Sequence, residues 1–468
     1  MTAPAWHPAC WSESSPEMRA RNLLSGAAYR MSAIVLACGS VAFPTTAVAQ
    51  EAPASQVNSS TQDISIDQFV ERLVQQGQIE KAEKLLEALD ASTPANEQLR
   101  FLRGLLALKK GDYRKAIDIF RAILVDHPEA LRVRLELARA HFMAREFQNA
   151  DRQFRAVRAE NLPPAVQANV DVFLGQIRMA KDWSYGLSVA IAPDTNINGA
   201  STTREVDIYG LPFRLSEDAR QKSGIGAAID ASLEYAPRIA PNGRFRLGAA
   251  LQRREYKGTQ FDDMTLALQA GPRFVLPKWD LSLLGTGFRR WYGGDAYASS
   301  FGGRMEATHY AGPRTVFNGS LAILRIEDER EDARSRWVYS ASLGGMRQIN
   351  QKSAVTVRLG INRQNAQENA YSNWAGVISA GYYRELPEGF SIYLEPSLAL
   401  TDYDAPLLAF GKARKDKVGS ITAAVLNRRI VLWRFTPRIA YSFTKSDSTI
   451  DLYDYNRHRL EFGLTAVF

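Results

Sequence analysis

The sequence predicts a two-part fold: an N-terminal α-helical solenoid of tetratricopeptide (TPR) repeats, followed by a C-terminal antiparallel transmembrane β-barrel of about 14 strands. Two periodicities support this division. Residues 64–181 have a helical pattern that repeats after about 34 residues, whereas residues 182–468 contain segments of about 10 residues in which apolar and polar side chains alternate. At 468 residues the chain also exceeds the size at which one hydrophobic core usually stops growing, so two domains are expected.

The overall composition is compatible with a barrel and argues against a helical membrane protein. The mean hydropathy is -0.25, and no uninterrupted apolar run approaches the roughly 20 residues that a membrane helix needs. Strands with one lipid-facing and one water-facing side look neutral on average. The net charge is +8, but Lys and Arg form no run or basic helix typical of a nucleic-acid footprint, so we expect no nucleic-acid partner.

Residues 1–49 are expected to be removed as a signal peptide together with an upstream extension. From Met18 the chain has basic residues, a short apolar stretch and then small residues up to Ala49, which is typical of a secretory signal cleaved after Ala49. The stretch before Met18 fits no part of such a signal, so the true start is expected at Met18 or Met31. Residues 50–63 then form a linker.

Both cysteines, Cys10 and Cys38, fall in this N-terminal segment. The mature chain would therefore have no thiol chemistry, which fits an oxidising compartment that the chain enters unfolded. The residues before Cys38 loosely resemble a lipoprotein signal. Lipidation of Cys38 is thus the alternative to cleavage after Ala49.

Residues 64–181 repeat in the manner of TPR units. Several positions coincide when the sequence is shifted by about 34 residues: the alanines Ala82, Ala116 and Ala150, the large apolar residues Leu86, Phe120 and Phe154, the glycines Gly77 and Gly111, and the prolines Pro94 and Pro128. In such units small residues let two helices touch, and a large apolar residue packs against the next pair. An ordinary helical bundle is the alternative, but it would not place prolines and alanines at one fixed interval. Residues 163–181 supply a last helix that caps the stack.

The concave face of the solenoid is the predicted substrate-binding surface, because the first helix of each TPR pair lines that face. The period places six candidate substrate-binding residues there: Phe101, Leu105, Lys109, Arg132, Arg139 and Met143, with Leu135 and Phe142 beside them. A mixed apolar and basic groove suits a polypeptide partner. The alternative for each residue is that it packs against the neighbouring helix.

Alternation in the second part separates a lipid-facing side from a lumen-facing side. Val357 and Leu359 fall on one face of their strand, and Arg358 falls on the other. The same reasoning turns Arg254 and Arg438 toward the lumen, because an arginine buried in lipid costs roughly 2–4 kcal/mol. These arginines either bind passing substrate or pair with lumen carboxylates, and the sequence leaves both alternatives open. A soluble sandwich also alternates, but it would seldom continue through so many long strands.

Short and long connections alternate along the barrel segment. Tight turns, such as those at residues 241–243 and 387–389, separate longer polar loops, of which the longest are expected at residues 194–222, 401–417 and 445–456. Short periplasmic turns and long outer loops produce this rhythm. An even strand number puts both ends of the barrel on the periplasmic side, where the preceding TPR domain must lie.

The chain ends in an alternating segment with a final aromatic residue, Phe468. This ending resembles the C-terminal signal that the outer-membrane barrel assembly machinery reads. Together with the signal peptide, it predicts a location in the outer membrane of a Gram-negative bacterium. The expected partners are outer-membrane lipids and, during biogenesis, the assembly machinery, and the chain is expected to be a monomer.

No arrangement of catalytic or metal-ligating residues emerges from the sequence, and we expect no enzyme activity, no cofactor and no metal. The histidines of the mature chain are scattered. His127 and His141 are expected on the TPR surface, whereas His309 and His458 lie in strands and could face the lumen. Neither strand histidine has a neighbouring Ser or Asp pattern that would indicate nucleophilic catalysis.

Two stretches together resemble the surface lipoprotein assembly modulator (Slam) family. They are the last TPR unit, LELARAHFMAREFQNADRQFRAV at residues 135–157, and the first strand with its exit, WSYGLSVAIAPDTNINGAS at residues 183–201. The specific element is the PDTNIN junction from Pro193 to Asn198, because TPR repeats joined to a barrel occur in other exporters as well. The resemblance covers the mature chain from the repeats to its end and implies a periplasmic TPR domain with a barrel of about 14 strands.

The resemblance implies an outer-membrane translocator that delivers specific proteins from the periplasm to the cell surface. Its cargo would be surface lipoproteins, usually ones that capture iron or haem, or in some branches a soluble secreted haemophore. The TPR domain would engage this cargo, and no catalytic residues are implied. The main alternative is an exopolysaccharide export porin, whose lumen should be rich in charges complementary to the polymer. A general diffusion porin would not explain the TPR domain.

Overall fold

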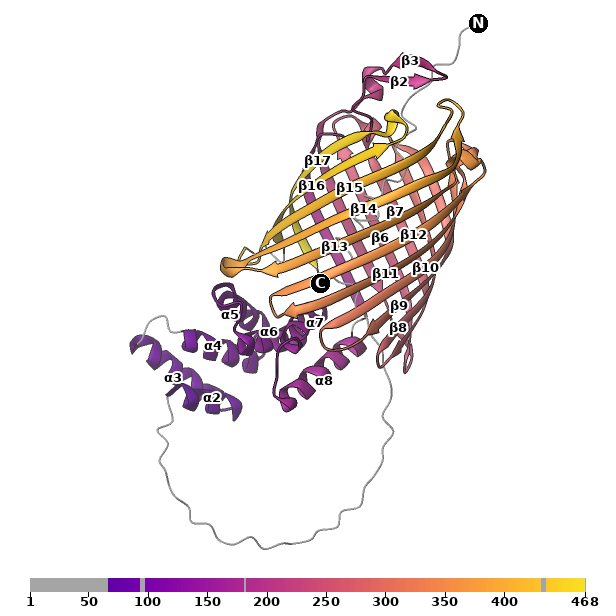
Figure 1. The fold of residues 1–468 in the computed structure, drawn as a ribbon. Coiled ribbons are helices and arrows are strands. Elements are labelled where there is room, and N and C mark those ends of the chain that lie inside the picture. Colours follow the sequence, from indigo (N-terminus) through magenta and orange to yellow (C-terminus); the bar gives the residue numbers. More distant parts are fainter. Residues whose placement is uncertain (1–65, 93–96, 181, 431–434, 468) are drawn as a thin grey trace, which may run out of the picture.

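The computed structural model describes residues 66–92, 97–180, 182–430 and 435–467 (Figure 1). Within these ranges seven helices are followed by a closed antiparallel β-barrel of 14 strands, which confirms the predicted fold class. The predicted signal peptide and linker, and also Pro94 and Phe468, lie outside the described residues.

The helices form three antiparallel pairs and a final single helix. The pairs are α2 (Ile66–Gln75) with α3 (Ile79–Ser92), α4 (Glu97–Lys110) with α5 (Tyr113–Asp126), and α6 (Leu131–Met143) with α7 (Phe147–Arg158), and the last helix is α8 (Pro164–Ala180). Helix α4 contacts both α2 and α6, so the first helices of the three pairs lie side by side on one face of the stack. None of the helices in the described ranges is long and apolar enough to cross a membrane.

The positions that repeat in the sequence are the ones that the stack buries. Ala82, Ala116 and Ala150 have 0% exposure, and so do Phe120 and Phe154. Each buried aromatic side chain stabilises the stack by roughly 1.5–3 kcal/mol through the apolar surface that it removes from water. Helix α8 packs against Phe154 and covers the apolar end of the stack, as a capping helix must.

The turn inside each helix pair requires a backbone in the left-handed region. Gly77 and Gly111 supply it with φ of 75° and 84°, and the third pair places Arg145 at the same repeat position with φ of 60°. In the third turn the N–H of Glu146 donates back to the carbonyl of His141 at 2.8 Å. Glycine adopts this conformation freely, whereas a residue with a Cβ does so at a cost of roughly 1–2 kcal/mol.

The barrel wall closes on itself without a free edge. Its strands are β1 (Trp183–Asp194), β4 (Gly224–Tyr235), β6 (Gly243–Tyr256), β7 (Asp263–Leu276), β8 (Trp279–Tyr292), β9 (Asp295–Tyr310), β10 (Thr315–Asp328), β11 (Arg336–Asn350), β12 (Ser353–Ala366), β13 (Asn373–Glu385), β14 (Phe390–Leu407), β15 (Lys412–Asn427), β16 (Thr436–Ser448) and β17 (Tyr455–Val467). Each strand pairs antiparallel with the next, and β1 pairs with β17. Every wall strand therefore has a partner on both sides, which the membrane interior demands.

Three short strands lie outside the main ring. Strands β2 (Glu205–Ile208) and β3 (Leu211–Arg214) form a hairpin in the connection between β1 and β4, which Figure 1 shows at the end of the barrel away from the helices. Strand β5 (Arg238–Ala240) pairs with β6 at the other end. The long connection expected at residues 194–222 is therefore present, and it carries a hairpin.

The two faces of the wall alternate as the sequence predicts. Leu359 and Ile361 point outward and are 49% and 52% exposed, as expected for side chains that contact lipid in the membrane. Arg358, which directly precedes Leu359 on β12, points into the lumen, where its guanidinium bonds to Glu395 of β14. Strands β13 and β14 stay paired in one constant register over most of their length.

The surface position expected for His141 is wrong, and His309 and His458 do not face the lumen, the possibility that the sequence leaves open. His309 and His458 have the outward parity of their strands: His309 stacks on Trp279 with ring centroids 4.2 Å apart, and His458 packs against an aromatic ring of β16. Outward parity places both on the lipid side of the wall and not in the lumen. His141 is buried instead of lying on the TPR surface, and its Nδ1 is 2.8 Å from a carboxylate oxygen of Glu146. Burial lowers the pKa of His141, so the ring is neutral at pH 7 and serves the packing of the stack.

Two of the expected long loops are shorter than predicted. Strand β14 continues to Leu407 and β15 begins at Lys412, so the loop expected at residues 401–417 is a turn between two extended strands. Similarly, β16 and β17 leave only a short connection inside residues 445–456. Polar side chains predict a loop, but strands that continue beyond the lipid have water on their outer face and are polar for that reason.

Packing against Phe120 limits the size of the residue at position 104 in α4. A Cβ added at Gly104 would lie 2.4 Å from a ring carbon of the buried Phe120. We predict that Gly104→Ala destabilises the helical domain by about 1–3 kcal/mol through overpacking. The test is urea unfolding, followed by circular dichroism, of a fragment spanning residues 50–181, which should be soluble and helical because repeat contacts are local.

The matched control is Gly175→Ala in α8, where an added Cβ meets nothing within 4 Å. This variant should unfold at the same urea concentration as the parent or a higher one, since alanine favours a helix. Equal unfolding midpoints for the two variants, or a fragment that is β-rich, would contradict the packing described here.

Candidate functional site

The candidate site begins on the concave face of the helical stack, formed by α2, α4 and α6. Arg132 of α6 lies with its guanidinium 5.0 Å above the ring of Phe101 in α4 and forms an ion pair with Glu71 of α2. The arginine side chain is nevertheless 58% exposed. Three helices from three successive pairs therefore meet around one solvent-accessible cation, as expected for a TPR groove.

The other candidate residues of this face differ in how far their side chains are exposed to solvent. Phe101 is buried in the core between helix pairs, and Leu105 is half-buried against the same core. Arg139 is partly exposed and bonds to Glu136 at 3.1 Å, while Lys109 and Met143 are exposed. The apolar members thus stabilise the stack, and the basic members with Met143 form the surface that a partner would contact.

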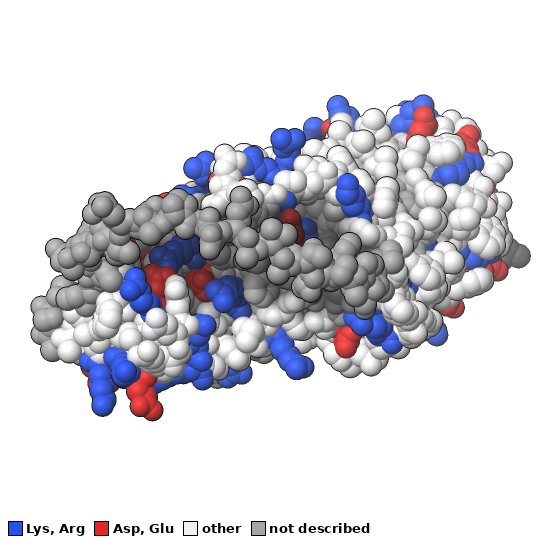
Figure 2. All heavy atoms as spheres, turned by 90° about the horizontal axis from the view of Figure 1, so that it is seen from below, with Lys and Arg blue, Asp and Glu red and all other residues white. Residues whose placement is uncertain are grey.

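Charge on the face seen from below is mixed. Figure 2 shows basic side chains spread among acidic and uncharged ones over the described part of this face, without a block of one sign. Such a surface favours a partner that offers both apolar and charged groups, as a polypeptide does.

The helical domain is attached to the rim of the barrel by a buried ion-pair cluster. Glu385, at the end of β13, accepts hydrogen bonds from Arg134 of α6 at 2.9 Å and from Arg428, beyond β15, at 3.0 Å. The side chains of Arg134 and Glu385 are 1% and 6% exposed. A charge so deeply buried is tolerated only when it is paired, so this cluster ties the two domains together.

A second group of contacts holds the turn between β11 and β12. The backbone N–H of Gln351 donates to Glu160 at 2.8 Å, and Lys352 pairs with Glu129 at 2.8 Å. The hydrogen bond from Lys352 lowers the pKa of Glu129, so the pair is ionised at neutral pH. Together with the Glu385 cluster, these contacts hold the stack against one end of the barrel, as Figure 1 shows.

The lumen arginines singled out from the sequence pair with carboxylates of the barrel wall. The pairs are Arg254 with Asp230 at 2.8 Å, Arg358 with Glu395 at 2.6 Å, and Arg438 with Glu461 at 3.4 Å. The structure thus favours the second of the two alternatives that the sequence leaves open. The carboxylates were not identified from the sequence, because only their inward parity distinguishes them from other acidic residues.

Further inward-facing arginines follow the same arrangement. Arg246 pairs with Glu234 and Glu306 at 2.8 and 2.7 Å, Arg273 pairs with Asp280 at 2.9 Å, and Arg290 pairs with Asp263 at 2.9 Å. Most of these bonds connect neighbouring strands, and they combine charge with hydrogen bonding. The described wall therefore offers paired charges to the lumen and not a field of one sign.

The PDTNIN junction locks the start of the barrel to its end. The side chain of Asp194 is 0% exposed and accepts hydrogen bonds from both Nε and Nη2 of Arg457 on β17, the closest at 2.6 Å. The same carboxylate accepts the backbone N–H of Asn196 at 2.9 Å, and the Asn196 side chain both donates to and accepts from the backbone of Ala200. Asn198 forms a similar pair of bonds with the backbone of the segment that returns to β4.

These bonds compensate for a gap in the β1–β17 ladder. The register runs to Ile191 opposite Phe462 and resumes at Asp194, and Pro193 in between has no N–H to donate. Beyond the gap, the backbone N–H of Thr195 donates to the carbonyl of His458 at 3.0 Å. Side chains of the junction therefore bridge the gap near the end of the ladder between the first and last strands.

Metal-ligating side chains do not gather at this site. Among residues 66–92, 97–180, 182–430 and 435–467, no group of three His, Cys, Asp or Glu side chains is placed to hold a metal ion. The site consists of a concave helical face, a domain junction and the wall of the barrel.

Two family models match the chain and together cover most of it. One, described as Surface lipoprotein assembly modifier, matches residues 183–468, and the other, described as Surface lipoprotein assembly modifier, N-terminal TPR repeats, matches residues 55–154. A protein named Surface lipoprotein assembly modifier from Moraxella catarrhalis is 25% identical and covers 79% of this chain and 73% of its own length. Surface lipoprotein assembly modifier 1 of Neisseria meningitidis serogroup B is 25% identical, with 78% and 75% coverage, and the relative from Pasteurella multocida is 22% identical, with 89% and 87%.

Solved structures that are similar to this chain are outer-membrane channels. A FadL homologue of Pseudomonas aeruginosa has 12% identity and a TM-score of 0.38 and covers 67% of this chain and 94% of its own. The channel DcaP of Acinetobacter baumannii has 8% identity and a TM-score of 0.37, with 61% and 96% coverage. Likeness at this level implies nothing about function.

The Glu385 cluster predicts that the domain junction depends on one carboxylate. Replacing Glu385 with Gln leaves Arg134 and Arg428 without their shared anion, and breaking a buried pair in this way costs about 3–5 kcal/mol. We expect the helical domain to detach from the rim while the barrel stays assembled. The measurement is thiol cross-linking between cysteines introduced at Glu129 and Lys352, whose side chains are in contact in the parent.

Two features make the cross-linking experiment specific: a control substitution at a neighbouring glutamate, and the position of both natural cysteines near the N-terminus. Glu388→Gln, an exposed change in the same turn, should leave the cross-link yield unchanged. The two natural cysteines lie in the first 49 residues, so the introduced pair is the only reactive one in the remainder of the chain. Equal cross-linking in both variants would show that the cluster does not hold the domains together.

The Asp194 interaction predicts that the barrel seam weakens when one charge is removed. Asp194→Asn keeps the side-chain shape but leaves Arg457 with a neutral partner, which should cost about 1–3 kcal/mol. The folded form on a heat-modifiability gel should then be lost at a lower temperature than in the parent. Asp207→Asn, in the exposed hairpin of β2 and β3, is the control, and the same transition temperature in both variants would refute the role of the junction.

Proposed function

The chain belongs to the surface lipoprotein assembly modifier family, and we propose that it is the outer-membrane translocator that delivers specific proteins from the periplasm to the cell surface. The family match supports a role in the surface delivery of lipoproteins at the outer membrane. The proposal extends the cargo to surface lipoproteins or soluble proteins that capture haem or iron. It also places the TPR domain in the periplasm.

The observation that carries the proposal is the position of the concave face. Arg134 belongs to the same helix as Arg132 and Arg139, and it is buried against Glu385 at the barrel rim. A cargo held by the concave face is therefore tethered close to one mouth of the barrel. Tethering of this kind raises the local concentration of a weakly bound chain without any new contact.

The wall of the lumen is compatible with passage of a polypeptide. Its arginines are paired with carboxylates, so a passing chain meets hydrogen-bonding groups without a strong field that would trap one sign of charge. A pore selective for a charged polymer would be expected to present unpaired charges of the opposite sign. Export of a polysaccharide is therefore the second candidate, and no feature of the described wall favours it.

Transport or assembly accounts for the helical stack, the domain junction and the closed barrel better than catalysis does. Family and fold are those of an outer-membrane transport or assembly protein and not of a known enzyme class. In the proposed cycle the barrel assembly machinery inserts the protein as a monomer, and lipids of the outer membrane surround its wall. The cargo then contacts the groove first and the lumen second.

The decisive experiment compares surface display with and without the protein. In a deletion strain, proteins encoded by neighbouring genes should be made and should reach the periplasm, but protease shaving of intact cells should no longer cleave one of them. Unchanged display of every such protein, together with loss of a secreted polysaccharide, would establish the export porin instead.

The same assay tests the groove at single residues. Lys109→Glu changes an exposed cation, and we expect it to reduce display of the cargo about tenfold, the effect of losing ~1.4 kcal/mol of binding. Reversal of Arg132 or Arg139 should act in the same direction, although Arg132→Glu also breaks the ion pair with Glu71. Lys84→Glu on α3, away from the first helices of the pairs, is the control, and an equal loss there would contradict a specific groove.

A further inference from the structure

Four strands of the barrel carry an outward-facing arginine at the same height. On β6, β8, β10 and β12 these arginines are Arg253, Arg289, Arg325 and Arg363, near the end of each strand that lies away from the helical domain. Outward apolar side chains on these strands, such as Leu247, Leu283, Ile323 and Ile361, are 44–60% exposed. The arginines therefore stand where the lipid-facing band of the wall ends.

Tryptophans stand beside three of these arginines. The guanidinium of Arg325 lies 6.0 Å from the ring centre of Trp337, and that of Arg363 lies 5.6 Å from Trp374. Arg289 has a similar contact with Trp291. Outward tryptophans are typical of the membrane–water interface, where amphipathic rings lie at the level of lipid headgroups. The arginines are therefore at the depth of the headgroup phosphates of the outer leaflet.

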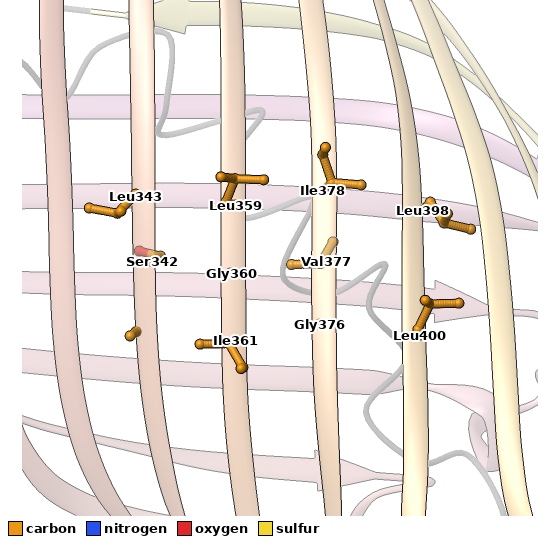
Figure 3. A pocket seen from close by; sticks show the side chains of 11 residues that line it. Ser342, Leu343, Leu359, Gly360, Ile361, Gly376, Val377, Ile378, Leu398 and Leu400 are labelled. Atoms are coloured by element: carbon orange, nitrogen blue, oxygen red, sulfur yellow. The ribbon is translucent and has the colours of Figure 1, made fainter.

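A groove in the lipid-facing surface lies directly beneath Arg363 and Trp374. It has a volume of about 370 Å³ and runs across β11 to β14 (Figure 3). Its lining is apolar: Leu343, Leu359, Ile361, Ile378, Leu398 and Leu400 surround the outward position of Gly376. A Cβ added at Gly376 would meet nothing closer than 4.0 Å, so the groove exists because this position has no side chain.

We propose that the groove and Arg363 together bind one phosphorylated, acylated lipid of the outer leaflet, with an acyl chain beside Gly376 and a phosphate on the guanidinium. Ile361, which lines the groove on β12, lies two residues closer to the membrane centre than Arg363. Gly376, which lines it on β13, lies two residues from Trp374. A headgroup at the arginine therefore directs its chain into the groove. The inference rests on the orientation in the proposed function, with the helical domain in the periplasm and the opposite end of the barrel at the outer leaflet, but it does not depend on the cargo.

An ion pair with Asp404 holds the guanidinium of Arg363 in place, and a phosphate would share this guanidinium through the N–H groups that the carboxylate does not use. Both terminal nitrogens of the Arg363 guanidinium donate to the carboxylate of Asp404, at 2.6 and 2.5 Å. Asp404 belongs to β14 and lies farther from the membrane centre than the groove. The pair is partly exposed, with side chains 23% and 29% accessible, so water screens it and it contributes little stability by itself. The carboxylate orients the arginine, and a phosphate approaching from the membrane side gains a charge-assisted hydrogen bond.

The experiment counts lipids retained by the full-length protein. The protein is purified from outer membranes in mild detergent, and native mass spectrometry measures bound lipid A, a phosphorylated and acylated glycolipid, after titration. Gly376→Leu fills the groove and Arg363→Gln removes the cation. Each should lower the apparent affinity about tenfold, as expected for the loss of apolar burial or of one charged hydrogen bond.

Matched controls lie on the same outer surface. Ala380→Leu places the same leucine side chain at another outward position on β13, and Arg347→Gln removes an outward cation near the opposite end of β11. Both should retain parental affinity. With dephosphorylated lipid A, Arg363→Gln should match the parent while Gly376→Leu remains weaker, which separates the phosphate contact from the chain contact.

Several outcomes would overturn the proposal. Equal affinities of Gly376→Leu and Ala380→Leu would show that the groove holds no particular chain. Retention of an acylated protein in place of a membrane lipid would assign the groove to a lipid anchor. If Gly376→Leu fails to assemble, Leu398→Trp fills the groove from β14 and takes its place, with heat-modifiable migration as the check on folding.

Discussion

The structure depends on one constraint, which is that every backbone polar group in the membrane must be paired within the protein. The barrel meets it by closing its 14 strands into a ring, and closure requires the first strand to find the last. The ladder between β1 and β17 is incomplete at Pro193, and the buried Asp194 with Arg457 completes the seam by side-chain bonds. The PDTNIN junction that characterises the chain is thus explained by closure of the barrel.

Charge inside the wall obeys a related constraint. A buried cation is costly unless an anion is close, and the inward arginines Arg246, Arg273 and Arg358 each have a carboxylate on a nearby strand. The same solution recurs outside the membrane, where Arg134 and Arg428 share Glu385 and fix the helical stack to the rim. Pairing of arginine with carboxylate therefore occurs both in the barrel wall and at the contact that positions the helical stack.

Arginines on both faces of the wall pair with carboxylates, but their surroundings differ. Inward arginines such as Arg246, Arg273 and Arg358 face the lumen together with their carboxylates. Outward arginines form a row beside tryptophans at the edge of the lipid-facing band, as Arg325 and Arg363 show, where membrane phosphates are within reach. In the proposed function, selectivity for cargo would reside in the concave face of the helical stack. Contacts with the membrane would be made by the outer wall of the barrel.

The sequence alone determines what depends on local periodicity. The repeat interval identifies Ala82, Ala116 and Ala150 as buried contacts, and strand alternation identifies Arg254, Arg358 and Arg438 as lumen residues, because helix and strand geometry repeat along the backbone. It leaves open which face of the wall His309 and His458 occupy, since a shift of one residue turns a strand side chain to the other face. Only the tertiary structure decides which carboxylate pairs with each arginine, that Phe101 is core, and that Arg134 meets Glu385. These contacts join residues far apart in the chain, and their partners are set by strand register and domain docking, for which no local pattern exists.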